Sequence, residues 1–280
     1  MPKAQTINTD VLEALTILPR KFTKINFILV GCGGTGSWLA MSIGRVARIL
    51  ADKFNIESEA VFVDPDTVEE KNIFRQNFCY AEIGHHKAEC LAFRVNAAWG
   101  LSVGAYTVPF DKAPIEIRTY DSTALYVIIG CVDNGKARED IAKHLSNNAD
   151  NVWWIDCGNE NGNGQVLIGG GIKKDVFQIA GKIIGLPLPI DQMPSLLQNN
   201  SSMRIGIDTS KMSCAEIAMI DEQGLTTNQM VASIASDYLV GLLLTGKLDH
   251  FQTFFDLRSG SMRSTFITPK NIKIHKTKGQ

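Results

Sequence analysis

The stretch whose residue types are best suited to chemistry is a glycine-rich run at residues 31–37, Gly-Cys-Gly-Gly-Thr-Gly-Ser. Glycines permit a tight turn, and without side chains they let backbone N–H groups come close to a phosphate. A helix that begins in such a turn also aims the positive end of its dipole at the phosphate charge. We therefore predict that this run binds a nucleotide; the alternative is a glycine-tolerant turn that binds no ligand.

The elements that must position this run form a βαβ unit. Residues 25–30 are an apolar run typical of a buried strand, and residues 38–50 have the spacing of a crossover helix. A second apolar run at 60–63 precedes Asp64, whose carboxylate we expect to accept hydrogen bonds from ribose hydroxyls. This acid lies beyond the roughly 20-residue spacing usual for NAD-binding folds, and we interpret residues 51–58 as an insertion that explains the delay. Spacing alone leaves an NAD-binding oxidoreductase open.

Four short blocks follow in order: G-x-G-G-x-G-S at 31–37, D-x-D-x-V at 64–68, N-x-x-R-Q at 72–76 and G-x-x-K-A-E at 84–89. With these blocks the sequence resembles the ThiF/MoeB and ubiquitin-activating (E1-like) superfamily of adenylating enzymes. The distance from the arginine to the lysine is one residue shorter than in the commonest form, which we interpret as a loop deletion.

The resemblance implies a set of nucleotide-binding residues in these blocks. Within it, Asn72, Arg75 and Lys87 would hold the phosphates, the arginine by its planar fork and the lysine as a point charge. Asp66 would either join the site or only shape the turn. The full set is Gly31, Gly33, Gly34, Gly36, Asp64, Asp66, Asn72, Arg75, Gln76 and Lys87.

Asp133 is the residue to which the resemblance assigns Mg²⁺. It belongs to a C-V-D-N-x-x-x-R run at 131–138, which follows a strongly apolar strand at 124–130. Ligands of open α/β sheets lie at the carboxyl ends of the parallel strands, where this acid falls. The alternative is a turn followed by the N-cap of a helix.

The activity that the resemblance implies is ATP- and Mg²⁺-dependent adenylation of a carboxylate. The acceptor would be the C-terminal glycine of a small ubiquitin-like or sulfur-carrier-type (β-grasp) protein. Two alternatives stay open: an NAD-dependent oxidoreductase and a ThiF-like scaffold that binds a nucleotide without catalysis.

Two further residues are candidates by position. Relatives have a cysteine near the S-C-x-x-E run at 213–216, so Cys214 is a candidate for carrying a thioester or sulfur, with a structural thiol as the alternative. This run and an N-Q pair at 228–229 are similar to ThiF-like proteins of the bacterial PRTRC plasmid cassettes. The family also implies a homodimer, in which Arg20 could enter the partner's ATP site.

The expected fold is α/β: a Rossmann-like, doubly wound, mostly parallel sheet with helices on both faces and an antiparallel C-terminal extension. Residues 1–24 would be an N-terminal segment and 25–280 a single ThiF-like adenylation domain. Within it, 25–150 would be the nucleotide-binding half, and 151–280 would contain a crossover loop and the acceptor-binding and dimerisation half. In this second half we expect a strand at 151–156, a turn-rich link at 157–164, the crossover loop at 185–213, a helix at 230–245 and a basic tail that frays after residue 267.

Composition excludes several classes of function. A net charge of −1 gives no electrostatic case for nucleic acid. The most apolar late run, 238–244, is too short to span a bilayer, and no leader precedes the fold, so we expect a cytoplasmic protein. The six cysteines include no C-x-x-C pair, so no zinc is expected.

Overall fold

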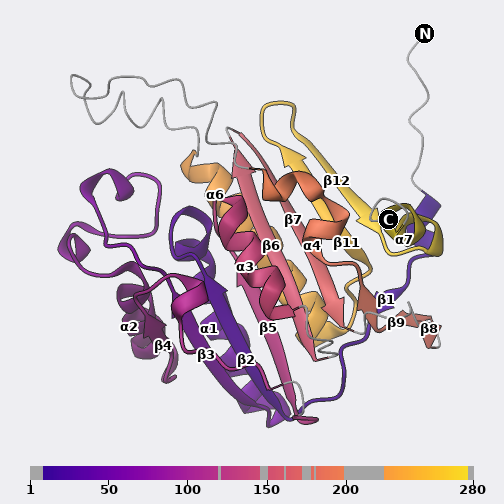
Figure 1. Cartoon of the computed structure of the whole chain (residues 1–280), viewed down its shortest axis with the longest axis horizontal. Coiled ribbons are helices and arrows are strands. Elements are labelled where there is room, and N and C mark those ends of the chain that lie inside the picture. Colours follow the sequence, from indigo (N-terminus) through magenta and orange to yellow (C-terminus); the bar gives the residue numbers. More distant parts are fainter. Residues whose placement is uncertain are drawn as a thin grey trace.

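The computed structural model describes residues 9–118, 121–145, 151–160, 162–171, 178–179, 181–198 and 224–276. Their central feature is a sheet with the strand order β12-β11-β7-β6-β5-β2-β3-β4, to which β10 is added beside β7 (Figure 1). The strands are β2 (Lys24–Val30), β3 (Glu57–Val63), β4 (Gly104–Tyr106), β5 (Ala124–Gly130), β6 (Val152–Glu160), β7 (Asn163–Gly171), β10 (Gly185–Leu186), β11 (His250–Asp256) and β12 (Ser261–Phe266).

The five strands from β4 to β6 are parallel, and the strands beyond β6 pair antiparallel, as predicted. The chain first builds outward from β2 through β3 to β4. It then returns to the other side of β2 with β5 and continues to β6. In an open α/β sheet, a ligand site is expected where the direction of winding changes, here between β2 and β5.

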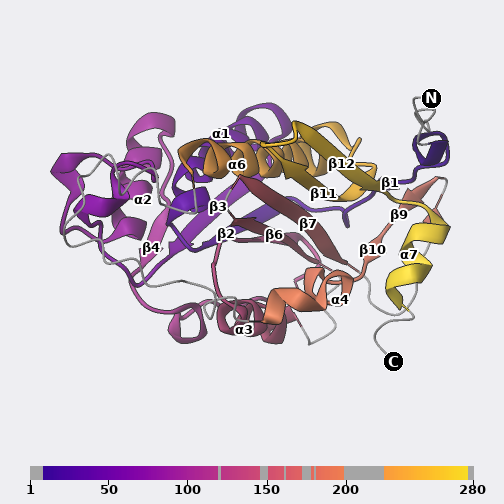
Figure 2. The ribbon, with the colours of Figure 1, turned by 90° about the horizontal axis from the view of Figure 1, so that it is seen from above.

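Helices cover both faces of the sheet, which makes the fold doubly wound (Figure 2). One face carries α1 (Gly34–Phe54), α2 (Lys87–Trp99) and α6 (Leu225–Val240), which continues into a π-helical turn, η8 (Gly241–Thr245). The other face carries α3 (Gly135–Leu145) and α4 (Pro189–Gln192). Each face has its own apolar core. Because both faces are covered, every residue of β5 is buried, which explains its unbroken apolar sequence.

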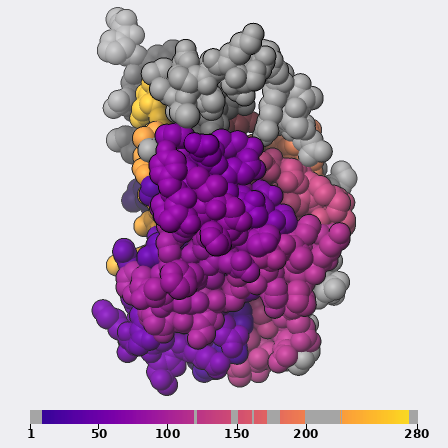
Figure 3. Space-filling model, turned by 90° about the vertical axis from the view of Figure 1, so that its left-hand side faces the viewer, coloured from indigo at the N-terminus to yellow at the C-terminus, as the bar shows by residue number. Residues whose placement is uncertain are grey.

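Smaller elements complete the molecule. A separate sheet has the order β1-β9-β8 and consists of β1 (Thr16–Ile17), β9 (Lys182–Ile183) and β8 (Gln178–Ile179). Helix α7 (Pro269–Lys276) follows β12. The short 3₁₀ turns are η1 (Thr9–Leu12), η2 (Glu70–Asn72), η3 (Tyr80–Glu82), η4 (Phe110–Lys112) and η5 (Pro194–Leu197). Seen from the β4 edge, the surface consists mainly of segments before residue 150 (Figure 3). Within the described ranges, no helix has both the length and the apolar character needed to cross a membrane.

Three elements extend beyond their predicted bounds. Helix α1 continues to Phe54, so half of the expected insertion is its last turn, and it ends where Asn55 adopts the left-handed conformation at φ 55°. Strand β6 continues to Glu160, through residues expected to form a link, because the hairpin with β7 pairs them. Helix α6 begins at Leu225 instead of residue 230.

Two stretches expected to lack regular structure contain short elements. Residues 185–213 were expected to form a loop, yet the described part includes β10, α4 and η5. The chain after residue 267 was expected to fray, but it forms α7. Pro189, Pro194 and Pro269 are the first residues of α4, η5 and α7. Proline favours that position because its missing N–H has no helical partner there, so these prolines begin helices instead of marking a loop.

Candidate functional site

The loops that follow β2, β3 and β5 meet at the carboxyl ends of these parallel strands. Val30 lies opposite Val63 on one side and Gly130 on the other, so the three strands end at the same level. The N–H of Gly31 donates to the carbonyl of Val63 (2.9 Å), and the N–H of Cys131 donates to that of Val30 (2.8 Å). The structure therefore brings together the glycine run, Asp64 and the Asp133 loop at the switch point.

The four glycines of the run have different surroundings. A Cβ at Gly36 would lie 1.9 Å from the carbonyl oxygen of Gly31, and one at Gly31, where φ is +90°, would lie 2.6 Å from that of Cys131. A Cβ at Gly34 would lie 2.6 Å from Oδ1 of Asn228. Gly33 is the least crowded of the four, because a Cβ there would meet only Nε2 of Gln76, at an ordinary contact distance of 3.8 Å. Three of these glycines are thus required by packing, whereas packing alone does not require a glycine at position 33.

Gln76 lies across from Gly33 and has an unusual amide. The residue is 5% exposed, and its buried Oε1 accepts no hydrogen bond within the described part of the chain. A buried acceptor without a partner is costly and rare in folded proteins. A ligand that donated an N–H or O–H to this oxygen would satisfy it, and the ribose hydroxyls and amino group of a nucleotide are such donors.

Asp64 supports the glycine run from β3. Its Oδ2 accepts from the N–H of Cys32 (2.6 Å) and its Oδ1 from the N–H of Asp66 (2.8 Å). Burial raises the pKa of Asp64, and these two backbone donors and Lys87 oppose the rise. Each carboxylate oxygen can accept a second hydrogen bond, so the predicted contact with ribose hydroxyls is compatible with this role.

Lys87 brings a positive charge to the same strand ends from the first position of α2. Its side chain is only 7% exposed, and Nζ donates to Oδ2 of Asp66 at 2.9 Å. Asp66 itself is 64% exposed. Two roles were left open for Asp66, joining the site or only shaping the turn. Its contact with Lys87, a predicted phosphate-binding residue, favours the first.

Asn72 and Arg75 belong to the loop that contains Gln76. Asn72 is buried, and its Oδ1 accepts a hydrogen bond from the N–H of Glu69 (2.9 Å). This bond caps the start of η2. The N–H groups of Arg75 and Gln76 both donate to the carbonyl of Asn72, at 3.1 and 2.8 Å. Asn72 therefore supports Arg75 and Gln76 through its backbone carbonyl, a role that the phosphate assignment did not include.

Asp133 is exposed and Asn134 is the cap of α3. Oδ1 of Asn134 accepts from the N–H of Ala137 (2.8 Å), while Nδ2 of Asn134 lies 3.3 Å from Oδ1 of Asp133. The helix-cap alternative thus applies to the asparagine and leaves the aspartate carboxylate facing outward. Among the described residues, no three His, Cys, Asp or Glu side chains gather as a metal site. One carboxylate fits Mg²⁺, which often binds one or two carboxylates together with substrate phosphates.

Two residues near the site were not predicted. Asn228 on α6 is completely buried between the glycine run and the Arg75 loop, and Asn159 on β6 donates to both Asn228 and Thr35. These contacts join residues that are far apart in sequence, so no local signal identifies them. Asn228 falls in the N-Q pair at 228–229. Because the helix was predicted to begin only at residue 230, the sequence did not place Asn228 in the first turn of α6.

Two cysteines near the site, Cys32 and Cys157, are buried thiols. Burial raises the pKa of Cys32 well above its usual value. A hydrogen bond with Cys131 and burial raise that of Cys157 in the same way. Such thiols are poor nucleophiles at neutral pH. The predicted carrier, Cys214, lies outside the described residues.

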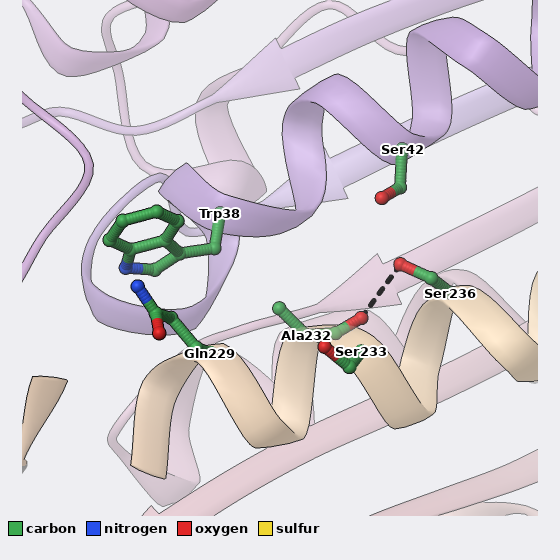
Figure 4. A pocket seen from close by; sticks show the side chains of 6 residues that line it. All are labelled: Trp38, Ser42, Gln229, Ala232, Ser233 and Ser236. Atoms are coloured by element: carbon green, nitrogen blue, oxygen red, sulfur yellow. Dashed lines mark hydrogen bonds between the residues drawn. The ribbon is translucent and has the colours of Figure 1, made fainter. Parts of the chain in front are cut away.

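Arg20 lies at the opposite end of β2 from the glycine run. It lines an open groove with residues such as Leu18, Ser122 and Leu243. A hollow near the site lies between α1 and α6, where Trp38 and Gln229 face one another (Figure 4). Its volume is about 260 Å³.

Comparison with known proteins agrees with this architecture. Residues 18–271 match the model of the ThiF family. No curated protein sequence matches the chain. A crystal structure of PaaA superimposes with a TM-score of 0.54 and 16% identity over 86% of this chain and 64% of that one. The crystal structure of E. coli MccB with AMPCPP and MccA superimposes with a TM-score of 0.52 and 14% sequence identity, over 87% of this chain and 64% of that one. The crystal structure of E. coli MccB with ATP has a TM-score of 0.51 and 15% sequence identity, over 87% of this chain and 64% of that one. The chain thus spans less than two thirds of the length of these proteins, whose similarity shows the fold.

Proposed function

We propose, from the premise that the chain belongs to the ThiF family, that it joins a carboxylate of a protein or peptide to the α-phosphorus of ATP and expels pyrophosphate. The observation that carries this proposal is the pair formed by Gly33 and Gln76. A Cβ at Gly33 would meet only Nε2 of Gln76, at 3.8 Å, and Oε1 of the same amide is a buried acceptor without a donor among the described residues. The ribose hydroxyls and the adenine amino group of ATP can donate to such an acceptor.

The chemistry requires positioning and charge compensation. The attacking carboxylate is already ionised at neutral pH, so no general base is needed. The barrier comes from bringing anions together and from the charge that develops on the phosphate oxygens. Lys87 would exchange its contact with Asp66 for a phosphate oxygen, and the guanidinium of Arg75 would bind a second one. Mg²⁺ would neutralise further phosphate charge, and Asp133 is the residue that would hold it.

The acceptor is the finer part of the proposal. E. coli MccB has been crystallised with MccA, which supports a protein or peptide carboxylate as the class. Within that class we propose the C-terminal glycine of a small ubiquitin-like protein, with transfer through Cys214 as a later step. We also propose the division into a nucleotide half at 25–150 and an acceptor half at 151–280, a cytoplasmic location and membership of the PRTRC subgroup.

The first test is nucleotide binding, which needs no acceptor. Titration calorimetry with ATP and Mg²⁺ should give binding, and NADH should give none. Exchange of labelled pyrophosphate into ATP, measured with small proteins encoded beside this gene, should then report adenylation. Binding of NADH without binding of ATP would instead establish the oxidoreductase alternative. Binding of ATP without exchange for any of these candidates would favour a scaffold.

Three substitutions test the residues that act on phosphate charge. Arg75→Ala, Lys87→Ala and Asp133→Ala should each lower the exchange rate by about 10²-fold or more, the usual effect of removing a group that stabilises developing charge. All three should fold, because Asp133 is exposed, Arg75 is half-buried and the partner that Lys87 leaves behind, Asp66, is exposed. Near-normal exchange in any of them removes that residue from the site.

A further inference from the structure

We infer that Asn228 is a positioning residue for the nucleotide site: it fixes the Arg75–Gln76 segment against the first turn of α1. Asn228 is 0% exposed, and its Nδ2 donates to the carbonyl of Arg75 at 3.1 Å. Its Oδ1 accepts from Nδ2 of Asn159 and lies 3.5 Å from Oγ1 of Thr35. One buried amide therefore holds three segments that are far apart in sequence.

The contacts of Asn228 fall beside Gly33 and Gln76, the two residues on which the proposed nucleotide site rests. Gln76 directly follows Arg75, whose carbonyl Asn228 binds. Gly33 directly precedes Gly34, whose missing Cβ leaves the room that the Asn228 amide occupies. Because an amide hydrogen bond is directional and these atoms are buried, Asn228 sets the separation between Gly33 and the unpartnered Oε1 of Gln76.

The position of Asn228 is itself fixed by the packing of α6 on α1. The residue after it, Gln229 on α6, faces Trp38 on α1 across the hollow between the two helices, as Figure 4 shows. Asn159 ties the same amide to the end of β6 and also donates to Oγ1 of Thr35 at 3.2 Å. A helix from the proposed acceptor half thereby determines the geometry of the nucleotide half.

The test compares Asn228→Ala with Asn151→Ala. Asn151 is also 0% exposed, and its Nδ2 likewise donates to backbone carbonyls, those of Ala124 (3.1 Å) and Arg118 (3.3 Å). It lies at the other end of β5, away from the glycine run. Both variants lose a buried amide, so loss of stability in unfolding experiments is expected of both and decides nothing. Only Asn228→Ala should loosen the site.

Amide hydrogen exchange by mass spectrometry is the readout that does not depend on activity. In Asn228→Ala, peptides that cover residues 72–78 should exchange about tenfold faster than in the unmodified protein, while in Asn151→Ala they should be unchanged. Unchanged exchange at 72–78 in Asn228→Ala overturns the inference. Because this measurement uses the protein alone, it decides the inference even if the protein binds no ATP, a result that would refute only the proposed function.

A second prediction concerns the affinity for ATP and rests on the proposed function. Asn228→Ala should raise the Kd for ATP by about tenfold, whereas Asn151→Ala should leave it unchanged. Asn228→Asp keeps the acceptor oxygen toward Thr35 but loses the donor toward Arg75, so it should resemble Asn228→Ala. An unaltered Kd in both Asn228 variants overturns the positioning role, even if stability falls.

Discussion

Two buried glutamines give opposite expectations for the same substitution. The amide of Gln192 is satisfied: Nε2 donates to the carbonyls of Ile168 (2.8 Å) and Pro187 (2.7 Å), and Oε1 accepts from Gln252. Oε1 of Gln76 has no such partner in the described part of the chain. We expect Gln76→Leu to leave the free energy of unfolding unchanged or to raise it by about 1–3 kcal/mol, because an unsatisfied acceptor disappears.

Nucleotide affinity should move in the other direction. Gln76→Leu removes the acceptor that we assign to ATP, so the Kd for ATP should rise about tenfold while stability is kept. Gln192→Leu is the matched control, since it breaks a satisfied network far from Gly33 and should lower stability without changing the Kd. Urea unfolding and calorimetry measure the two quantities. A destabilised Gln76→Leu with normal affinity would show that the amide serves only the fold.

The residues in sequence blocks could be predicted, and those that support them could not. Gly33, Lys87 and Asp133 come from short patterns that directly precede or follow strands and helices, so their position at the carboxyl ends of the parallel strands follows from the βαβ rule. The N-Q pair at 228–229 does not place Asn228 at the site, because its neighbours lie at residues 34, 75 and 159 and depend on how α6 packs. Long-range contacts of this kind are set by tertiary structure alone.

Helix α3 is fastened to β6 by a buried ion pair. Nε of Arg138 donates to Oδ1 of Asp156 at 3.0 Å, and the two side chains are 9% and 0% exposed. Burial raises the pKa of Asp156, and Arg138 opposes that rise. The family block at 131–138 contains this arginine, and the structure gives it a role in holding α3, whose first turn follows Asp133.

Breaking this pair from one side should be costly. Asp156→Ala leaves the guanidinium of Arg138 buried without its charge partner, and we expect a loss of about 3–5 kcal/mol in the free energy of unfolding. Asp52→Ala is the control, because its pair with Arg48 is exposed and should contribute little. Urea unfolding of both variants and of Arg138→Met/Asp156→Leu tests this. The double variant should lose less than Asp156→Ala, and the reverse order would contradict the argument.

Element type was easier to predict than element ends. The unbroken apolar sequence of β5 gave its bounds correctly, because a strand buried on both faces has no polar position. The end of β6 was missed because Gly158 and Asn159 favour turns locally, yet pairing with β7 keeps them in the strand. The early start of α6 was missed because Thr226, Thr227 and Asn228 are weak helix formers.

At the scale of the whole molecule, the position of Arg20 restricts where it can act. The seven residues of β2 lie between Arg20 and the glycine run, a distance of about 20 Å at roughly 3.3 Å per residue. An arginine side chain is too short to cover that distance, so Arg20 cannot reach the nucleotide site of its own chain. The proposed role for this residue therefore requires a second copy, and we propose a homodimer.

A mixing experiment tests the shared site. If Arg20 completes the partner's site, Arg20→Ala and Lys87→Ala should each abolish pyrophosphate exchange when measured alone. A mixed dimer then contains one site with both changes and one site with neither. After equal mixing and subunit exchange, half of the dimers are mixed and half of their sites are intact, so activity should return to about a quarter of the unmodified level. Light scattering at micromolar protein should show dimers throughout. Monomers, or an active Arg20→Ala, would contradict the role in trans, because each chain would then complete its own site.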